Sequence, residues 1–155
     1  MTPLTYVLLA LLPYTIPNHK LIFKPNIFFN DLEQLSGHSN KSLRAALRNA
    51  KLKRFISFEE ASIKISLVGR QKLQPFVAQK LGKNAQLMVI FDIPEEMARS
   101  RKKFRSLLVM MDFQQVQQSV LTSRYDHRQI LVETIVDLGL EAFVEIYEAD
   151  KINVI

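Results

Sequence analysis

The spacing of hydrophobic residues predicts three helices in the first third of the chain. An apolar run predicts a buried helix over Pro3–Pro13, with a proline near its start. After a segment punctuated by Pro and Asn, Pro17–Pro25, a short helix is expected at Asn30–Ser36, and a glycine ends it. Ser39 is the expected N-cap of a helix from Asn40 to about Lys53. The apolar residues of this helix recur at helical spacing, at Leu43, Ala46, Leu47 and Ala50.

The residues that follow predict a β-hairpin and a fourth helix. Phe55–Phe58 and Ser62–Leu67 have strand-like composition, and the second segment alternates apolar and polar residues. The turn between them falls at Glu59-Glu60-Ala61. A helix is then expected over Leu67–Leu81, with Pro75 bending it or setting its start. Helices joined by a tight turn and followed by a hairpin predict a winged helix-turn-helix.

The second half of the chain alternates between strand-like and helix-like patterns. Leu87–Phe91 is a continuous apolar run typical of a buried strand, and Pro94 begins a helix whose apolar stripe ends at Met111. Gln114–Ser123 predicts one bent strand or two. A helix near His127–Leu138 and a strand at Phe143–Tyr147 complete the order β-α-β-(β)-α-β, a ferredoxin-like plan. The expected fold class is therefore α+β, a winged helix-turn-helix followed by a ferredoxin-like βαββαβ domain.

Charge divides the chain into the same two parts. Residues 1–83 hold 13 Lys and Arg against four Asp and Glu, net +9, whereas residues 84–155 hold eight against 11, net −3. We therefore expect a basic winged-helix DNA-binding domain at 1–83 and a ferredoxin-like dimerisation domain at 84–155, with Gly82-Lys83-Asn84 as a short hinge. The charge asymmetry indicates a polyanion as partner of the first part, and double-stranded DNA is the expected one.

Composition narrows the class of protein further. The chain is 48% hydrophobic, enough to bury a core, and it contains no cysteine, which excludes disulfides, thiolate zinc sites and cysteine nucleophiles. The apolar run at Leu4–Leu12 is too short to span a membrane and no basic residue precedes it, so we expect a cytoplasmic protein with no membrane partner. The three histidines show no metal-ligand spacing and no phosphate-cradling glycine loop is present, so no cofactor is expected.

The helix that begins at Asn40 carries the candidate DNA-binding surface. Its basic residues recur every three or four positions and form a ridge, and no acidic residue lies between Glu33 and Glu59. We expect Arg44 and Arg48 to contact bases, Lys41, Lys51 and Lys64 to contact phosphates, and three polar residues to place the helix start against the backbone. The predicted DNA-binding residues are Ser39, Asn40, Lys41, Ser42, Arg44, Arg48, Lys51 and Lys64.

Two alternatives to DNA binding remain for this basic face. It can be an ordinary solvated surface, or it can bind an acidic protein, with the second domain acting as a dimerising adaptor. A second basic run, at Arg99–Arg105, is spread around its helix and is more typical of a solvated face.

Several short motifs in the second half resemble a known family. Val89–Glu95, then Gln118-Ser119-Val120, Leu138-Gly139-Leu140 and the strand at Phe143–Glu148 occur in the order seen in the ferredoxin-fold subunit of CRISPR spacer acquisition. They resemble still more the central domain of PaaX-type transcriptional regulators, in which a winged helix directly precedes this domain. The resemblance implies a homodimeric transcriptional regulator that binds specific sequences in double-stranded DNA. We expect it to be a repressor.

The resemblance does not extend to every part of those regulators. They continue into a further C-terminal domain that we expect this chain to lack, because it stops at Ile155. Their small-molecule effector, such as an acyl-coenzyme A thioester, is therefore not carried over, and the effector stays unknown.

The CRISPR subunit also implies an alternative function. In that subunit the aspartate that ends the first strand is associated with a divalent metal and nuclease activity, and Asp92 occupies this position. Two Asp92 side chains in a dimer would bind Mg²⁺ and make the protein a metal-dependent endonuclease or a spacer-acquisition subunit. The simpler interpretation is that Asp92 marks the strand-to-helix turn.

Overall fold

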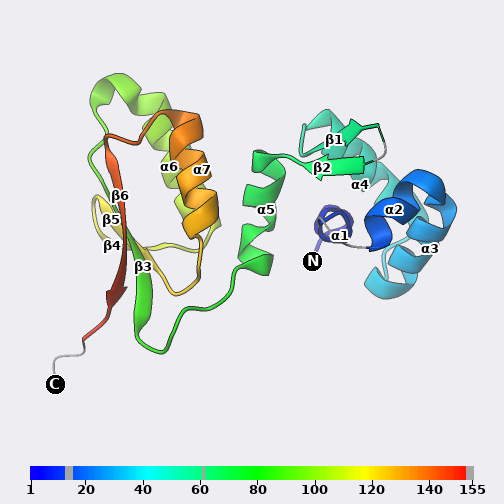
Figure 1. Cartoon of the computed structure of the whole chain (residues 1–155), viewed down its shortest axis with the longest axis horizontal. Helices are drawn as coiled ribbons and strands as arrows, with labels where there is room; N and C mark the ends of the chain where they lie inside the picture. The colour runs from blue at the N-terminus through cyan, green and yellow to red at the C-terminus, as the bar shows by residue number, and fades with distance from the viewer. Residues whose placement is uncertain (13–15, 61, 153–155) are drawn as a thin grey trace. The chain divides into compact units, whose positions relative to one another are not determined.

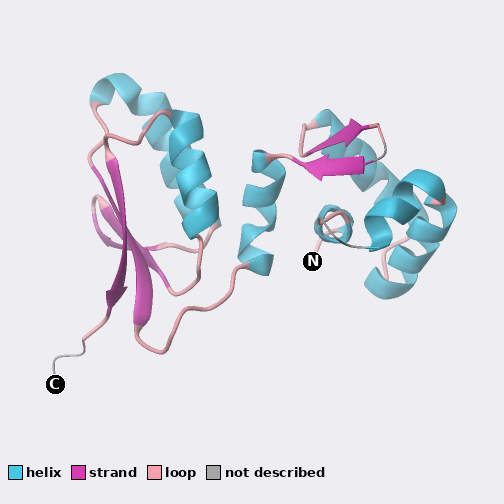
Figure 2. Cartoon of the chain, viewed as in Figure 1, coloured by secondary structure: helices cyan, strands magenta, loops and turns pink. Residues whose placement is uncertain are grey.

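The chain divides into two units, residues 1–73 and 74–155, and each is described by itself. The structure is a computed structural model, and it describes residues 1–12, 16–60 and 62–152. Both units combine helices with antiparallel strands (Figure 2), which confirms the α+β class. The division falls inside one helix, α5 (Leu67–Val77), whose residue Leu73 is buried in the core of the first unit.

The first unit contains one helix that the sequence did not predict. No element was predicted in the Pro17–Pro25 segment, but it holds α2 (Ile16–Phe23). The helix predicted at Asn30–Ser36 also begins earlier, at Pro25. Proline is accommodated in the first turn of a helix because its missing N–H would have no intrahelical partner there. The other elements are α1 (Pro3–Ala10), α3 (Pro25–Ser36), α4 (Asn40–Leu52), β1 (Ile56–Glu59) and β2 (Ser62–Ile65) (Figure 1).

The apolar stripe of α4 packs into the core of the first unit, as its spacing predicts. Leu43, Ala46 and Ala50 are buried, and they meet apolar side chains from α1 and α3. Gly37 ends α3 in the left-handed conformation, at φ 71°, and its amide donates to the Glu33 carbonyl. The buried core consists of Val7, Leu8, Leu11, Leu21, Phe28, Phe29, Leu32, Leu43, Ala46, Ala50, Ile56, Ile63 and Leu73.

The predicted hairpin forms, with β1 and β2 antiparallel and Ile56 opposite Ile65. Its turn includes Ala61, which lies outside the described residues. The helix expected over Leu67–Leu81 is shorter than predicted. It ends at Val77, and residues 79–81 run extended beside residues 124–126, with the Leu81 amide donating to the Arg124 carbonyl at 2.8 Å. The backbone groups of residues 79–81 therefore form hydrogen bonds with a distant part of the second unit. The local sequence does not reveal this pairing.

The second unit is a four-stranded antiparallel sheet with two main helices. The strands lie in the order β4 (Gln114–Gln117), β5 (Val120–Ser123), β3 (Ala85–Phe91) and β6 (Val144–Asp150). The first and last strands in chain order, β3 and β6, therefore pair along seven residues. The segment Gln114–Ser123 forms two strands. In chain order the elements are β3 (Ala85–Phe91), the 3₁₀ turn η1 (Glu95–Met97), α6 (Ala98–Met110), β4 (Gln114–Gln117), β5 (Val120–Ser123), α7 (Arg128–Leu138) and β6 (Val144–Asp150).

Helices cover one face of this sheet, and no described helix of the second unit covers the other, hereafter the open face (Figure 1). Helices α6 and α7 lie on the same side of the sheet (Figure 1). Leu87, Val89 and Phe91 of β3 point to that side and are buried, and the Phe91 ring meets the Phe104 ring of α6 edge to face at 5.8 Å. Side chains at the alternate positions, such as Met88 and Ile90, therefore point to the open face.

Candidate nucleic-acid interface

The start of α4 is held by side-chain caps. Ser39 accepts a hydrogen bond from the Ser42 amide at 3.3 Å and donates one to the Ser42 hydroxyl at 3.1 Å. The Asn40 amide donates to the Glu33 carboxylate of α3 at 3.1 Å, and the Asn40 side chain donates to Asn30. Ser39, Asn40 and Ser42 thus fix the turn between α3 and α4 by contacts within the protein.

The face of α4 opposite the core is polar and cationic. Lys41 and Arg48 lie seven residues apart on this side, and both are exposed. Ser42 and Asn49 flank them and are also exposed. Leu52, at the end of the helix, is 80% exposed, so an apolar side chain also lies on this surface. The arrangement presents two long cations, two hydrogen-bonding groups and one apolar group to solvent.

Arg44 does not point freely to solvent. Its Nε donates to the Asn40 side chain at 2.6 Å and its Nη2 donates to Asn26 at 2.8 Å. The guanidinium lies over the Phe29 ring, 4.4 Å from the centroid. The sequence places Arg44 on the basic ridge. In the structure its guanidinium contacts α3 and so joins α4 to that helix.

The two remaining predicted cations also have partners within the unit. The Lys51 ammonium lies 5.1 Å from the Phe58 ring centroid, which brings the end of α4 against β1. Lys64 on β2 forms an ion pair with Glu59 at 2.6 Å, and both side chains are more than half exposed. An exposed pair of this kind is weak, so Lys64 can exchange Glu59 for another anion at small cost.

Two cations that were not among the predicted DNA-binding residues extend this surface. Lys53 and Arg54 follow α4 directly, and both are exposed. Arg54 has φ of 56°, and its carbonyl accepts a hydrogen bond from the Ser66 hydroxyl at 2.7 Å. The signal was the dense basic run at residues 51–54, which continues past the predicted end of the helix. The basic surface of the first unit therefore covers the exposed face of α4 and the approach to β1.

Asp92 follows the end of β3 and is exposed. Its amide donates to the Phe143 carbonyl at 2.9 Å, which joins the end of β3 to the residue before β6. Within residues 1–12, 16–60 and 62–152, no three His, Asp or Glu side chains come together in a group that could hold a metal ion. No helix in the same described ranges is long and apolar enough to cross a membrane.

The open face of the second unit is hollowed. A cavity of about 560 Å³ lies over the sheet, and its lining includes apolar Met88 of β3 and Val116 of β4. Val116 is 61% exposed and Tyr147 of β6 is 45% exposed. The Tyr147 hydroxyl donates to the Glu145 carboxylate at 2.6 Å, and this hydrogen bond raises the pKa of Tyr147. This face thus exposes apolar side chains from β4 and β6, and β3 contributes the half-buried Met88.

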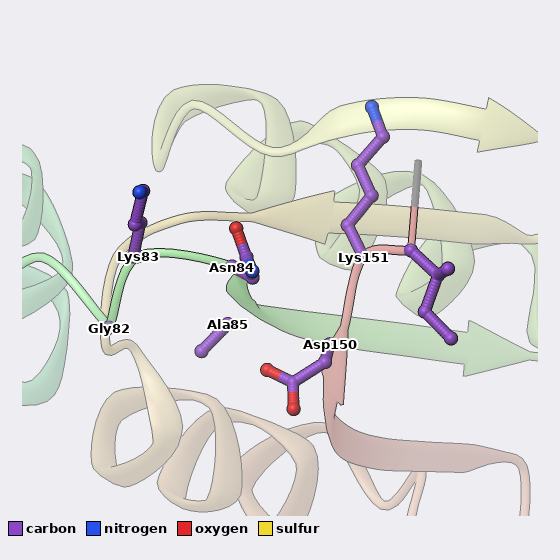
Figure 3. Close-up of a pocket in the computed structure, with 7 residues that line it drawn as sticks. Gly82, Lys83, Asn84, Ala85, Asp150 and Lys151 are labelled. Atoms are coloured by element: carbon purple, nitrogen blue, oxygen red, sulfur yellow. The ribbon is translucent and has the colours of Figure 1, made fainter. Parts of the chain in front are cut away.

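A second hollow lies where β3 begins and β6 ends (Figure 3). It is lined by residues 82–85 and 150–152, and the Lys151 amide donates to the Asn84 carbonyl at 2.9 Å. The Asp150 carboxylate and the Lys151 ammonium point to opposite sides (Figure 3). The residues described around this hollow therefore do not present the converging polar groups typical of a ligand site.

The second unit buries one histidine. His127 precedes α7, is 1% exposed, and lies 5.2 Å from the Phe113 ring between centroids. Burial lowers the pKa of His127, because a charged imidazolium loses its hydration there, and the Asp126 carboxylate opposes this shift. The structure therefore favours a neutral side chain at this position.

Comparison with known proteins shows what the second unit is similar to. Residues 86–154 match the family model described as the PaaX protein central Cas2-like domain. No curated protein and no solved structure was found to match the chain. The match covers the sheet and both of its helices, and it confirms the resemblance seen in the short motifs. Residues 86–154 are therefore similar to the PaaX central Cas2-like domain.

Proposed function

We propose that this protein is a homodimeric transcriptional regulator that binds specific sequences in double-stranded DNA and acts as a repressor. At family level, the PaaX-type domain in the second unit supports a PaaX-like regulator. The observation that carries the proposal is the exposed cationic face of α4, with Lys41 and Arg48 pointing to solvent on the side opposite the core.

The element order of each unit supports the finer fold assignment. In the first unit, α3 and α4 are joined by a tight turn at Gly37 and are followed by the antiparallel β1-β2 hairpin, which is the order of a winged helix-turn-helix. In the second unit, the order βαββαβ with the first strand between the third and the fourth supports a ferredoxin-like fold. A helix of the size of α4 fits the major groove.

The contacts within the first unit suggest a different role in DNA binding for each group of residues. Arg48 is the proposed base-reading residue, because it is exposed at the centre of the polar face. Lys41, Lys51 and Lys64 are proposed phosphate contacts, with Ser39, Asn40 and Ser42 placing the helix start against the backbone. Arg44, held by Asn26, Asn40 and Phe29, is proposed to reach the DNA only from the edge of the interface.

The open sheet face is the proposed dimer interface. Exposed apolar side chains on one face of a sheet are a usual mark of an association surface. A two-fold dimer through this face would place two copies of the first unit on one duplex, and such a protein reads two half-sites related by symmetry.

The nuclease alternative receives no comparable support. Asp92 supplies one carboxylate per chain at the predicted metal position, and metal-dependent hydrolysis would need the dimer to bring two Asp92 side chains together around Mg²⁺. We therefore propose that Asp92 marks the turn after β3.

A selection of bound sequences from random duplex DNA tests this function. The full chain is incubated with the duplex pool, with and without Mg²⁺, and Asp92→Ala is run beside it. The proposal requires an enriched sequence with two symmetric half-sites that is left uncleaved and is bound equally by the variant. Absence of an enriched sequence, with Mg²⁺-dependent cutting that Asp92→Ala abolishes, would replace the regulator with the nuclease.

A further inference from the structure

A cavity of about 350 Å³ lies within the first unit, among α1, α2 and α3. Its walls are mainly apolar, and its size falls at the lower end of the range of small-molecule sites. The described lining residues are Tyr6, Leu9, Ala10, Lys20, Phe28, Asp31, Leu32 and Leu35. Leu35 is 77% exposed although it lines the cavity, so it lies at the rim.

One ion pair interrupts the apolar lining. Lys20 and Asp31 face each other at 2.7 Å, and their side chains are 39% and 53% exposed. Because both are partly hydrated, the pair is weak and Lys20 can accept a competing anion. The first unit holds 11 Lys and Arg against four Asp and Glu in residues 1–73, so its overall charge attracts an anion and repels a cation.

We propose that this cavity binds a small apolar monocarboxylate. The apolar body of the ligand lies against Leu9, Phe28 and Leu32, and its carboxylate replaces Asp31 as the partner of Lys20. An apolar pocket with one charged group at its mouth is the arrangement that orients such an amphiphilic molecule.

The cavity is connected to the proposed DNA-binding helix through α3. One face of α3, at residues 28, 31, 32 and 35, lines the cavity. The neighbouring face, at residues 26, 29, 30 and 33, contacts Asn40 and Arg44 of α4. A ligand that moves α3 must therefore change the contacts that hold the start of α4, because the two faces belong to one rigid helix.

Calorimetric titration of the full chain with sodium octanoate tests the site, with octylamine and 1-octanol as matched probes. We expect octanoate to bind more tightly than either. Lys20→Gln should weaken octanoate binding roughly fivefold, and Asp31→Asn should tighten it, because the ligand no longer competes with the internal carboxylate. Lys24→Gln removes the same charge from an exposed residue outside the described cavity lining, and it should bind octanoate like the unaltered chain.

Amide chemical shifts test the connection to α4. Octanoate should shift the amide signals of Asn40 and Arg44, and Lys20→Gln should require more octanoate for the same shift. The proposal is overturned if none of the three probes binds, if octylamine binds most tightly, if Lys20→Gln and Lys24→Gln behave alike, or if the α4 signals do not move.

Control of DNA binding by this ligand rests on the proposed function. It is measured as the affinity for the enriched duplex with and without saturating octanoate, and we expect a loss of about tenfold. If the duplex is not bound even without octanoate, the proposed function fails while calorimetry still decides the cavity. If the duplex is bound equally with octanoate present, the regulatory connection fails.

Discussion

At the residue scale, contacts decide which cations of the basic ridge can read DNA. Arg44 and Arg48 have the same side chain and lie four residues apart on α4. The Arg44 guanidinium donates hydrogen bonds to Asn26 and Asn40, whereas the Arg48 side chain is exposed. A bidentate contact with a guanine edge needs two guanidinium donors that are not already bonded within the protein. Arg48 is therefore favoured over Arg44 as the base-contacting residue.

Arg48→Ala should weaken binding to the selected duplex by about 1 to 3 kcal/mol and relax sequence preference at one position of each half-site. Lys51→Ala should weaken binding to all duplexes by a similar factor and lower the dependence on salt. Fluorescence anisotropy against specific and random duplexes over a series of salt concentrations measures both. Arg99→Ala, which removes an exposed cation of α6, is the control. Equal losses on specific and random DNA for both α4 variants would contradict the division of roles.

His127 predicts a dependence of stability on pH. Its folded-state pKa is lowered by burial, so between the two pKa values the unfolded chain binds a proton that the folded chain does not. The free energy of unfolding should therefore fall as pH drops below the ordinary histidine pKa of about 6.5, and it should level off below the folded-state pKa.

Denaturant titrations between pH 5 and 8 measure this slope. His127→Phe, which keeps a ring beside Phe113 and Tyr125, should lose this part of the slope. His38→Gln should retain it, because His127 is unchanged. A slope that survives in His127→Phe would assign it to another group.

At the element scale, one glycine allows the hairpin and α5 to meet. A Cβ at Gly69 would clash with the Phe55 carbonyl oxygen and lie 2.7 Å from Ile65 Cγ2. The backbone before β1 and the end of β2 thus approach the first turn of α5 too closely for any side chain.

Gly69→Ala should lower the free energy of unfolding by about 1 to 3 kcal/mol, the usual cost of overpacking, although alanine by itself favours a helix. Gly82→Ala is the matched control, since its Cβ would meet only the Ala85 Cβ at 3.9 Å. Thermal or denaturant unfolding compares the two. If Gly69→Ala is as stable as Gly82→Ala, the close approach at Gly69 is not a constraint.

At the scale of the whole molecule, the proposed regulator depends on association. The open sheet face exposes Val116 and Tyr147, and the helices on the other side expose apolar residues too, among them Val132 of α7 at 54%. We propose that the open sheet face, and not the helical side, forms the two-fold interface that pairs the DNA-binding units.

Val116→Asp should convert the dimer to a monomer, because it places a charge in the proposed interface, and it should weaken binding to the two-half-site duplex more than to a single half-site. Val132→Asp introduces the same charge on the helical side and should leave the dimer intact. Sedimentation analysis measures the oligomeric state. A dimer that survives Val116→Asp but not Val132→Asp would move the interface to the helices.

The sequence by itself determined the elements whose signals are local. The apolar spacing of α4, the glycine that ends α3, the alternation in β2 and the apolar run of β3 each predicted the element observed. The motifs of the second half predicted the similarity to the PaaX central Cas2-like domain. Helix α2 and the end of α5 were missed, because proline is accommodated in a first helical turn and residues 79–81 take their partners from residues 124–126.

Only the tertiary structure decided what each side chain of the basic ridge can do. The helical spacing places Arg44, Arg48 and Lys51 on α4 without saying which of them already have partners, since Asn26, Phe29 and Phe58 come from other elements. The same holds for Lys64 of β2, whose partner Glu59 ends β1. The cavity among α1, α2 and α3, the buried His127 and the open sheet face are likewise decided by the tertiary structure. Each is formed by residues distant in sequence, and only packing brings them together.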